Sequence, residues 1–370
     1  MQSELTVDGF RYLVNLHTTV RCLSINSNLV RIIGLRNIPY SILYSSAIKW
    51  SVELEKESNS YKERNGKLTE GGVPTTALKH YLTLSKELGL SQKLNDIYRI
   101  SRLGKILYMF IQDKNPHEFE LSNYEKLFYL LIIFLNDFDG ASILLSTIIE
   151  NESELSQKQL QELFVDKLKD RLLLKQKSSD TKTKHLLLEK YKKIEYTWQN
   201  PPKYSEHIIT PRLDWLADLD LVDIAKTKGT NAYKISPFGK NLFTTIPTLT
   251  DNMTKDINEE WINTSLVKCL TMNYEQRFFW EQIDQNKQIE AIKDYLDLAT
   301  KELSSIGSHR ISFHTSFIFI TILLFIKTRT VLEKKDLKEL LLSKIQINDK
   351  IYSLHLAARK NEEYITFKYV

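Results

Sequence analysis

The sequence predicts a mainly helical protein with a few small β-hairpins, and three observations support this fold class. Long segments space their apolar residues by three and four, as one face of an α-helix requires. Only 11 glycines and 8 prolines occur in 370 residues, which indicates short connections between helices. Strand-like stretches occur at only a few places, and two of them open copies of the same ten-residue motif.

Composition is that of an ordinary globular protein, with 42% hydrophobic and 26% charged residues. The length allows two or three compact domains, each with a sizeable core. The first residues show no basic segment followed by an apolar run, so we expect no secretory signal. Cys22 and Cys269 stand in unrelated contexts, which predicts neither a disulfide framework nor a zinc site and favours a cytoplasmic location.

The longest apolar runs are expected to form core helices. They cover Leu127 to Leu135 and Phe317 to Ile326, far short of the roughly 18 to 20 residues that span a bilayer. We therefore expect no membrane association. The clearest loops by composition are 58–74 and 200–206, which are rich in Pro, Gly, Asn and charged residues.

A ten-residue motif occurs twice, as YRISRLGKIL from Tyr98 to Leu107 and as YKISPFGKNL from Tyr233 to Leu242. Six of the ten positions are identical. The serine of each copy stands where its hydroxyl would cap a helix. The glycine three residues later would let that helix approach its neighbour closely, because no Cβ intervenes.

Each motif copy closes a larger pattern: a leucine-rich helix, a short polar hairpin whose second strand carries the tyrosine, and a new helix. The preceding helices are TTALKHYLTLSKELGL and ITPRLDWLADLDLVDI. This pattern resembles the winged helix-turn-helix superfamily in its prokaryotic form, in which a β-hairpin wing follows a recognition helix. Residues 312–370, two helices and a closing hairpin, resemble a looser third copy. Three such units loosely resemble the recognition part of type IIS restriction enzymes.

The resemblance implies tandem winged-helix units joined by helices. We expect an N-terminal winged-helix-like domain at 1–120. A helical segment with a second winged-helix unit would follow at 121–250. A C-terminal helical domain ending in a β-hairpin, the candidate third winged helix, would occupy 251–370.

In the first unit, polar donors share one face of the helix that precedes the hairpin, opposite Leu78, Tyr81, Leu82 and Leu88. Such donors suit phosphates and base edges. Further basic residues follow the hairpin. The candidate DNA-binding residues here are Thr76, Lys79, His80, Thr83, Lys86, Arg99, Arg102 and Lys105. A solvated helix face, or a protein-binding one, remains an open interpretation.

The second winged-helix unit has features that favour DNA binding and features that oppose it. We expect its helix to expose Asp214 and Asp218 beside Trp215, and two carboxylates would repel a phosphate backbone. Its hairpin offers further candidate DNA-binding residues: Lys226, Lys228, Asn231 and Lys234. The unit would therefore bind DNA through its hairpin, or bind a protein with Trp215 as an anchor.

Net charge favours an anionic partner. The chain carries +5 overall, with a pI of about 8.8. Between Lys167 and Lys203 stand 11 basic and 4 acidic residues, so the local balance is 11 − 4 = +7. Tyr191, Tyr196 and Trp198 offer stacking surfaces nearby, as nucleic-acid contact would require. A solvated helical pair remains the alternative.

Catalytic signatures are sparse. We find no phosphate-binding loop and no nucleophile elbow. His309 and His314 do not share a helical face. Asp336-Leu337-Lys338 has the letters of a nuclease motif, but it stands in a predicted helix. We therefore expect no catalytic residue, no metal site and no cofactor.

These observations predict a non-enzymatic protein that binds duplex DNA through tandem winged helices and a basic linker. It would act as the recognition subunit of a prokaryotic antiviral-defence or mobile-element system, with any catalysis in a protein partner. The alternative is a structural subunit whose winged helices assemble a multiprotein complex. A metal-dependent nuclease is a third hypothesis.

Overall fold

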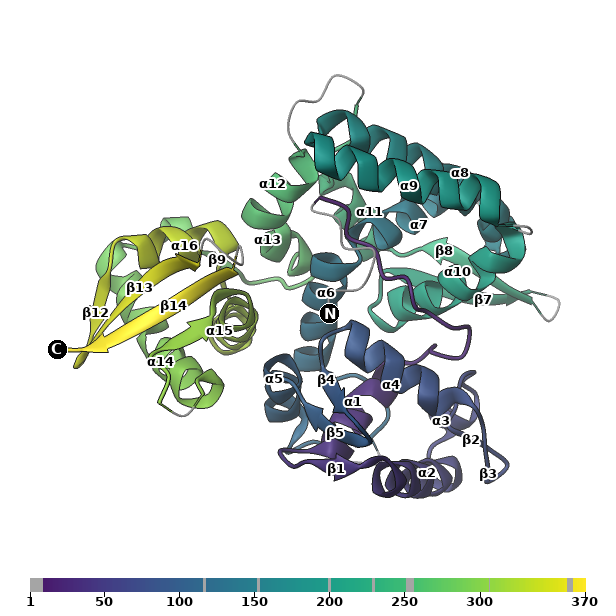
Figure 1. The fold of residues 1–370 in the computed structure, drawn as a ribbon, viewed down its shortest axis with the longest axis horizontal. Helices are drawn as coiled ribbons and strands as arrows, with labels where there is room; N and C mark the ends of the chain where they lie inside the picture. The colour runs from purple at the N-terminus through teal and green to yellow at the C-terminus, as the bar shows by residue number, and fades with distance from the viewer. Residues whose placement is uncertain are drawn as a thin grey trace. The chain divides into compact units, whose positions relative to one another are not determined.

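The structure is a computed structural model that describes residues 9–115, 118–151, 154–198, 201–227, 230–250, 256–305, 307–357 and 362–370. Helices dominate, and several small, mostly antiparallel sheets accompany them (Figure 1). The expected mainly helical class is confirmed. The chain divides into two compact units, Met1–Glu259 and Glu260–Val370. The three-domain division expected from the sequence stays a prediction.

The larger unit begins with an extended segment, residues 9–22, that we call the N-terminal strap. Its elements follow in chain order: α1 (Leu23–Ile33), β1 (Ile38–Pro39), α2 (Tyr40–Glu57), α3 (Asn59–Lys62), β2 (Thr69–Glu70), β3 (Val73–Pro74), α4 (Ala77–Glu87), β4 (Ser91–Leu94), β5 (Ile97–Ile100), α5 (Arg102–Ile111), α6 (Asn123–Asn136), α7 (Phe138–Glu150), β6 (Leu155–Ser156), α8 (Gln157–Ser178), α9 (Thr181–Thr197), α10 (Pro201–Asp218), β7 (Val222–Thr227), β8 (Thr230–Ile235) and α11 (Pro237–Thr245).

Helix α12 (Ile257–Thr264) crosses the division between the units. The smaller unit continues with α13 (Leu266–Leu270), β9 (Phe278–Phe279), a 3-10 turn (Trp280–Gln282), α14 (Gln285–Leu303), β10 (Arg310–Ser312), α15 (Phe313–Thr328), β11 (Thr330–Val331), α16 (Lys334–Leu342), β12 (Ile345–Ile347), β13 (Lys350–Ala357) and β14 (Glu362–Tyr369).

A similar element order occurs three times: a helix, a short strand, further helices and a hairpin, with the additional β2–β3 hairpin in the first occurrence and the additional strands β11 and β12 in the third. We call these parts the first repeat (α1 to α5), the second repeat (α7 to α11) and the third repeat (α14 to β14). In each repeat the short strand pairs antiparallel with the last strand of the hairpin. The register joins Ile38 to Tyr98, Leu155 to Tyr233 and Ile311 to Ile365.

The ten-residue motif has the same geometry in the first two repeats. Ser101 Oγ accepts the Gly104 N–H at 3.0 Å, and Ser236 Oγ accepts the Gly239 N–H at 2.9 Å. A Cβ added at either glycine would lie 2.0 Å from a backbone carbonyl oxygen, that of Leu90 or Leu221. The expected caps and close approaches are therefore confirmed.

The long apolar runs lie in the core, as expected. All side chains from Leu127 to Leu135 on α6 are buried, as are most of those from Phe317 to Phe325 on α15. Within the described part of the chain, no single helix has both the length and the apolarity to cross a bilayer. Helices α6 and α7 meet those limits only together, as a pair bent by 101°.

One expected loop is wrong. Residues 201–206 form the first turns of α10, although the sequence there reads PPKYSE. Proline is tolerated in a first helical turn because the backbone N–H groups there have no partner within the helix. The same helix contains Pro211.

Candidate nucleic-acid interface

Helix α4 has one buried and one open side. Leu78, Tyr81, Leu82 and Leu84 are buried, and the Tyr81 hydroxyl accepts the Cys22 N–H at 3.0 Å. The opposite side carries the sequence-predicted donors: Thr76, Lys79, Thr83 and Lys86 are exposed and His80 is half-buried. Two ammonium groups and two hydroxyls on one exposed face are able to meet phosphate oxygens and base edges.

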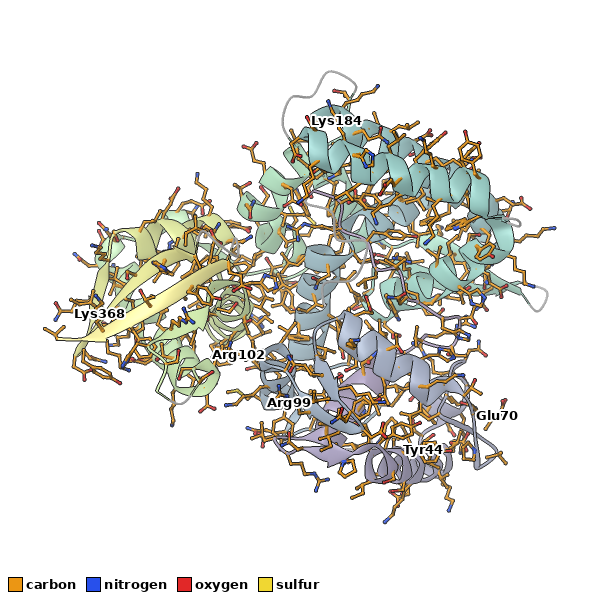
Figure 2. All side chains as sticks on the ribbon, in the orientation of Figure 1. Tyr44, Glu70, Arg99, Arg102, Lys184 and Lys368 are labelled. Carbon is orange, nitrogen blue, oxygen red and sulfur yellow. The ribbon has the colours of Figure 1, made fainter. Side chains whose placement is uncertain are left out.

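The β4–β5 hairpin, which we call the first hairpin, and the start of α5 add further cations. Arg99 is exposed on β5 and donates to Gln92 Oε1 across the hairpin at 3.1 and 3.3 Å. Arg102 is exposed and Lys105 is half-buried on α5. Arg99 and Arg102 extend from the strand and from the helix that follows it (Figure 2). The structure thus keeps most of the expected basic side chains on the surface of the first repeat.

Two exposed apolar side chains flank the turn of the β4–β5 hairpin, which the sequence analysis missed. Leu94 and Ile97 flank the turn with 71% and 46% of their surfaces exposed. Side chains alternate between the two faces of a strand, and this alternation along β4 and β5 could have predicted that Leu94 and Ile97 are exposed. Lys93 lies beside them, paired with Asp96 at 3.1 Å.

Three histidines from remote parts of the larger unit meet beside Lys79, and this cluster also escaped the sequence analysis. The His17 ring, on the strap, stacks on His80 of α4 with centroids 3.6 Å apart, and lies 5.2 Å from His207 of α10. Burial, then the neighbouring His17 and Lys79, lower the pKa of His80 to about 4. His80 is therefore an uncharged hydrogen-bonding group near neutral pH.

Asp214 and Asp218 of α10 do not face solvent, which corrects the expectation for the second winged-helix unit. Asp214 pairs with Arg21 of the strap, and Asp218 pairs with Arg64. Asp218 also accepts the Leu23 N–H at 3.2 Å. Asp214 and Asp218 are therefore each paired with an arginine of the larger unit.

Trp215 is not an exposed anchor either. Only 1% of its surface is accessible, and its indole N–H donates to the Val20 carbonyl at 2.7 Å. The strap therefore covers the side of α10 that was expected to be open.

The hairpin of the second repeat is partly described. Lys234 is exposed on β8 and Asn231 is half-buried. Backbone pairing joins Lys226 to Asn231. The Lys226 side chain and the whole of Lys228 lie outside the described residues. The structure therefore brings Asn231 and Lys234 to this hairpin, and the proposed roles of Lys226 and Lys228 stay predictions.

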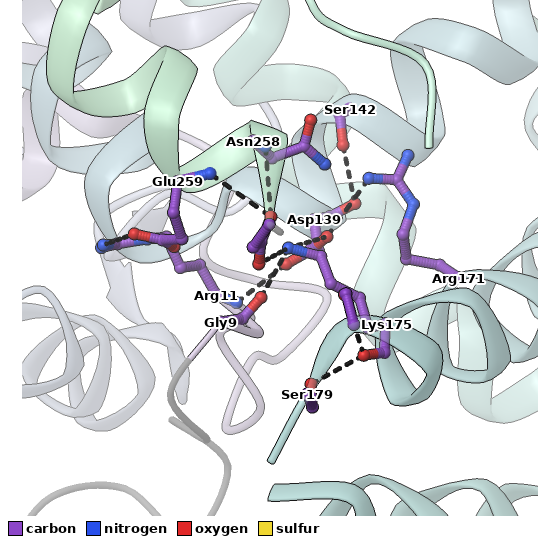
Figure 3. Close-up of polar contacts among 11 residues, drawn as sticks. Gly9, Arg11, Asp139, Ser142, Arg171, Lys175, Ser179, Asn258 and Glu259 are labelled. Carbon is purple, nitrogen blue, oxygen red and sulfur yellow. Dashed lines mark hydrogen bonds and ion pairs between the residues drawn. The ribbon is translucent and has the colours of Figure 1, made fainter. Parts of the chain in front are cut away.

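The expected basic linker is largely a pair of neighbouring helices, α8 and α9, and two of its cations form ion pairs inside the larger unit. Arg171 pairs with Asp139 at 3.2 Å. The Lys175 ammonium, only 2% exposed, contacts Asp256 at 2.7 Å and the Gly9 carbonyl at 2.6 Å (Figure 3). Arg171 and Lys175 therefore leave the candidate surface, whereas Lys182, Lys184 and Lys192 stay exposed.

Figure 3 shows the polar contacts that these cations and the strap make. The strap passes α7, α8 and α12, where Asp139 Oδ2 accepts the Arg11 N–H at 2.9 Å. The Arg11 guanidinium forms a two-bond pair with Glu259 at 2.6 and 2.7 Å. These charges hold the strap against α7, α8 and α12.

The described residues contain no group of three His, Cys, Asp or Glu side chains arranged to hold a metal ion. Asp336 closes a capping box with Glu333 at the start of α16, so its carboxylate has a local structural role. His309 lies in the segment that precedes β10, whereas His314 lies in α15.

No protein-family model and no curated protein matches this chain. Among solved structures the chain is similar to the restriction endonuclease FokI, at 12% identity and a TM-score of 0.33. The match covers 97% of this chain, which spans 64% of the length of that structure. A TM-score this low carries no argument about fold or activity.

Proposed function

We propose that this chain binds duplex DNA and that the exposed face of α4 reads it. The observation that carries the proposal is the division of α4 into a buried apolar side and an exposed side with Lys79, Thr83 and Lys86. Arg99 and Arg102 on the neighbouring elements would add phosphate contacts. Contacts to phosphates would supply the affinity, and the helix would supply base recognition.

The same proposal interprets the three repeats as winged-helix units. Their common element order and the pairing of the short strand with the hairpin support this reading. In such a unit α4, α10 and α16 occupy the position of the helix before the hairpin. The first repeat is the DNA reader in this proposal, because Asp214 and Trp215 of α10 are engaged by the strap.

The second repeat, in this proposal, has two roles. Its helix α10 joins the first and second repeats through internal ion pairs. Its hairpin, with Lys234 exposed and Asn231 half-buried, adds phosphate contacts. Of the α8–α9 cations, only exposed ones such as Lys182, Lys184 and Lys192 would take part. Cytoplasmic location, a non-enzymatic role and a catalytic partner in a prokaryotic defence or mobile-element system belong to the same proposal and rest on the resemblance alone.

The test measures duplex-DNA affinity over a series of salt concentrations. The test variant is Lys79→Glu plus Lys86→Glu, and the control variant is Lys287→Glu plus Lys301→Glu. Both pairs reverse two exposed lysines and change net charge equally, but the control pair lies on α14. We expect the α4 variant to lose most of its affinity and to flatten the slope of log affinity against log salt by about 2. Equal losses in both variants, or no wild-type binding near about 100 mM salt, would refute the proposal.

Protein assembly is the second candidate function, because the two exposed apolar side chains that flank the turn of the β4–β5 hairpin favour it. Leu94 and Ile97 are exposed side by side across the turn, and clustered exposed apolar side chains mark interfaces. In that case Leu94→Ser plus Ile97→Ser would abolish co-purification of a partner and leave DNA affinity unchanged. A matching loss of DNA affinity would instead assign these two side chains to the DNA interface.

A further inference from the structure

The four-stranded sheet of the third repeat has one buried and one open face. Its strands lie in the order β10, β14, β13 and β12 (Figure 1). Side chains alternate between the two faces of a strand, and the buried Tyr352, Ile365 and Phe367 mark the face that packs against α14, α15 and α16. On the opposite face, which we call the open face, every described side chain is exposed or half-buried.

The backbone register brings cations and rings together on the open face. Arg310 of β10 pairs with Thr366 of β14, and Lys368 lies two residues further along β14. Tyr364, two residues before Thr366, pairs with His355 of β13. Paired residues of an antiparallel sheet point to the same side, as do alternate residues of one strand. All these side chains therefore share one face.

The two cations of the open face lack carboxylate partners. On the buried face of the same hairpin, Lys350 contacts Asp297 at 2.8 Å. Arg310 and Lys368 are both exposed, and within the described residues no ion pair joins either of them to a carboxylate. The sheet therefore neutralises the cation on its buried face and leaves positive charge uncompensated on its open face.

The Arg310 guanidinium is held in place by a ring. Its carbon lies 5.0 Å from the centre of the Tyr364 ring. A guanidinium that stacks on a ring keeps its N–H groups directed outward, where they bond phosphate oxygens in pairs. The Tyr364 hydroxyl donates to Glu362, which is the one carboxylate on the described part of the open face and lies six residues from Lys368.

An exposed imidazole completes the open face. His355 lies on β13, one of the two central strands, and is exposed. Beside it, Ser353 and Thr366 bond to each other through their hydroxyls at 2.8 Å. These short side chains leave the middle of the face low and polar. The His355 ring is therefore accessible to a planar ligand, and histidine is one of the side chains on which unpaired bases stack.

We infer that the open face binds single-stranded nucleic acid, with an unpaired base stacked on His355 and neighbouring phosphates bonded to Arg310 and Lys368. Sequence-tolerant single-strand binding combines base stacking with cations that follow the backbone, and an open four-stranded sheet is a suitable platform for it. A duplex offers no base face unless a step is unstacked. The open face would therefore select unpaired strands, whereas the face of α4 takes duplex DNA.

A protein partner is the competing occupant of an open sheet face. Protein interfaces are organised around a core of apolar and aromatic side chains from which water is excluded. The largest aliphatic side chain on the described part of the open face is Ile351, and it is only 37% exposed. Its neighbours are polar, and the two unpaired charges are both positive. These observations favour an anionic ligand that carries bases.

The experiment measures fluorescence anisotropy of a labelled oligothymidylate of about 12 nucleotides, a length within common single-strand site sizes. The full chain carries Lys79→Glu and Lys86→Glu as background, so that the proposed duplex site does not contribute. The test variant is Arg310→Gln plus Lys368→Gln. We expect it to lose about tenfold in affinity and to flatten the slope of log affinity against log salt by about 1.4, or about 0.7 for each cation removed.

The matched control for the cations is Lys287→Gln plus Lys301→Gln. Both lysines are exposed, and they lie on α14 in the same repeat. The control changes net charge as much as the test variant does. It should leave the affinity for oligothymidylate and its salt slope unchanged.

Stacking is tested separately at His355. We expect His355→Ala to weaken oligothymidylate binding about tenfold and His355→Tyr, which supplies another ring, to retain it. The control is His185→Ala, which removes an exposed imidazole on α9 and should change nothing. Duplex binding, measured without the background substitutions, should not respond to His355→Ala, so that failure of this inference is distinguishable from failure of the proposed duplex site.

Two results would overturn the inference. The first is absence of oligothymidylate binding near about 100 mM salt, or equal losses in the Arg310→Gln plus Lys368→Gln variant and its α14 control. The second is a loss of duplex affinity in the Arg310→Gln plus Lys368→Gln variant together with no effect of His355→Ala on oligothymidylate. That outcome would assign the open face to the phosphates of a duplex.

Discussion

Helices α4 and α10 stand at the same place in the first two repeats, yet one exposes its polar face and the other buries it. Counting back seven residues from Leu90 and Leu221, whose carbonyls contact the motif glycines, places Thr83 and Asp214 at equivalent positions. Thr83 is exposed, whereas Asp214 is 6% exposed and paired with Arg21. The same local scaffold therefore serves two purposes.

The cause of this difference lies far away in the chain. Arg21 is 193 residues from Asp214, and Arg64 is 154 residues from Asp218. The strap brings Arg21 and the Val20 carbonyl to α10, and the first residue of α1 brings the Leu23 N–H. A local motif fixes a hairpin and a capped helix, but remote charged partners decide which helix face remains open to a ligand.

The largest expected effect comes from substituting Arg212, and Tyr81 is the comparison. Arg212 lies nine residues before Leu221, and Tyr81 lies nine residues before Leu90. Arg212 is 1% exposed and forms a two-bond pair with the fully buried Asp137 at 2.6 and 2.7 Å. Arg212→Leu leaves that carboxylate without its partner, so we expect the free energy of unfolding in urea to fall by about 3–5 kcal/mol. Tyr81→Phe loses one neutral hydrogen bond to Cys22, and we expect about 1–3 kcal/mol.

The control for this contrast is the double variant Arg212→Leu with Asp137→Leu. It removes both charges and should recover part of the loss, because the desolvated carboxylate is gone. A double variant as unstable as Arg212→Leu alone would show that the pair is not the origin of the effect. The two repeats would then differ for another reason.

A second prediction tests whether the two motif copies are structurally equivalent. Gly104→Ala and Gly239→Ala each place a Cβ 2.0 Å from a carbonyl oxygen that belongs to the backbone. The helix must shift in either case, and overpacking of this kind costs about 1–3 kcal/mol. We expect equal losses in urea unfolding, with exposed Lys240→Ala as the control on α11. Clearly unequal losses would break the equivalence on which the comparison of α4 and α10 depends.

The features that could be predicted from the sequence are those encoded within a few residues. The motif serines, the motif glycines and the apolar runs on α6 and α15 each carry their own signal. The apolar side of α4 follows from helical periodicity. These local patterns determine most of the elements and the face of α4 that is buried.

The remaining features depend on long-range contacts that no spacing reveals. Asp214 and Asp218 look like exposed charges until Arg21 and Arg64 are folded onto them. His17, His80 and His207 are far apart in sequence, and the open face of the third repeat joins residues 310–312 to 351–368. The error at 201–206 is different in kind: a Pro-Pro pair is typical of loops, but the first helical turn also accepts it.

A third prediction concerns the face of α10 that the strap covers. Arg21→Ala leaves Asp214 buried without its cation, and we expect a loss of about 2 kcal/mol in the free energy of unfolding. Hydrogen exchange of the α10 amides should accelerate as the strap loosens. Thr83→Ala, at the equivalent exposed position, should stay within about 0.5 kcal/mol of wild type. Restoration of slow exchange by Arg21→Asp with Asp214→Arg would assign the effect to the pair itself.

The smallest expected effect concerns pH and the place where His17 of the strap, His80 of α4 and His207 of α10 meet. His80 faces His17, His207 and Lys79, and its pKa of about 4 lies below the ordinary value of about 6.5. Between those values the unfolded chain binds a proton that the folded chain does not. The contribution of His80 to stability is therefore present above pH 6.5 and lost as pH falls toward 4.

We expect His80→Gln to flatten this acid-side decline in urea unfolding curves, while His355→Gln, an exposed histidine of the third repeat, leaves it unchanged. The difference between wild type and His80→Gln should be greatest near neutral pH and shrink as pH falls. An unchanged decline in His80→Gln would mean that the imidazoles do not couple α4 to the strap and α10. In that case the exposed and the buried helix would be independent, and the face of α4 would be available to DNA whatever the state of the second repeat.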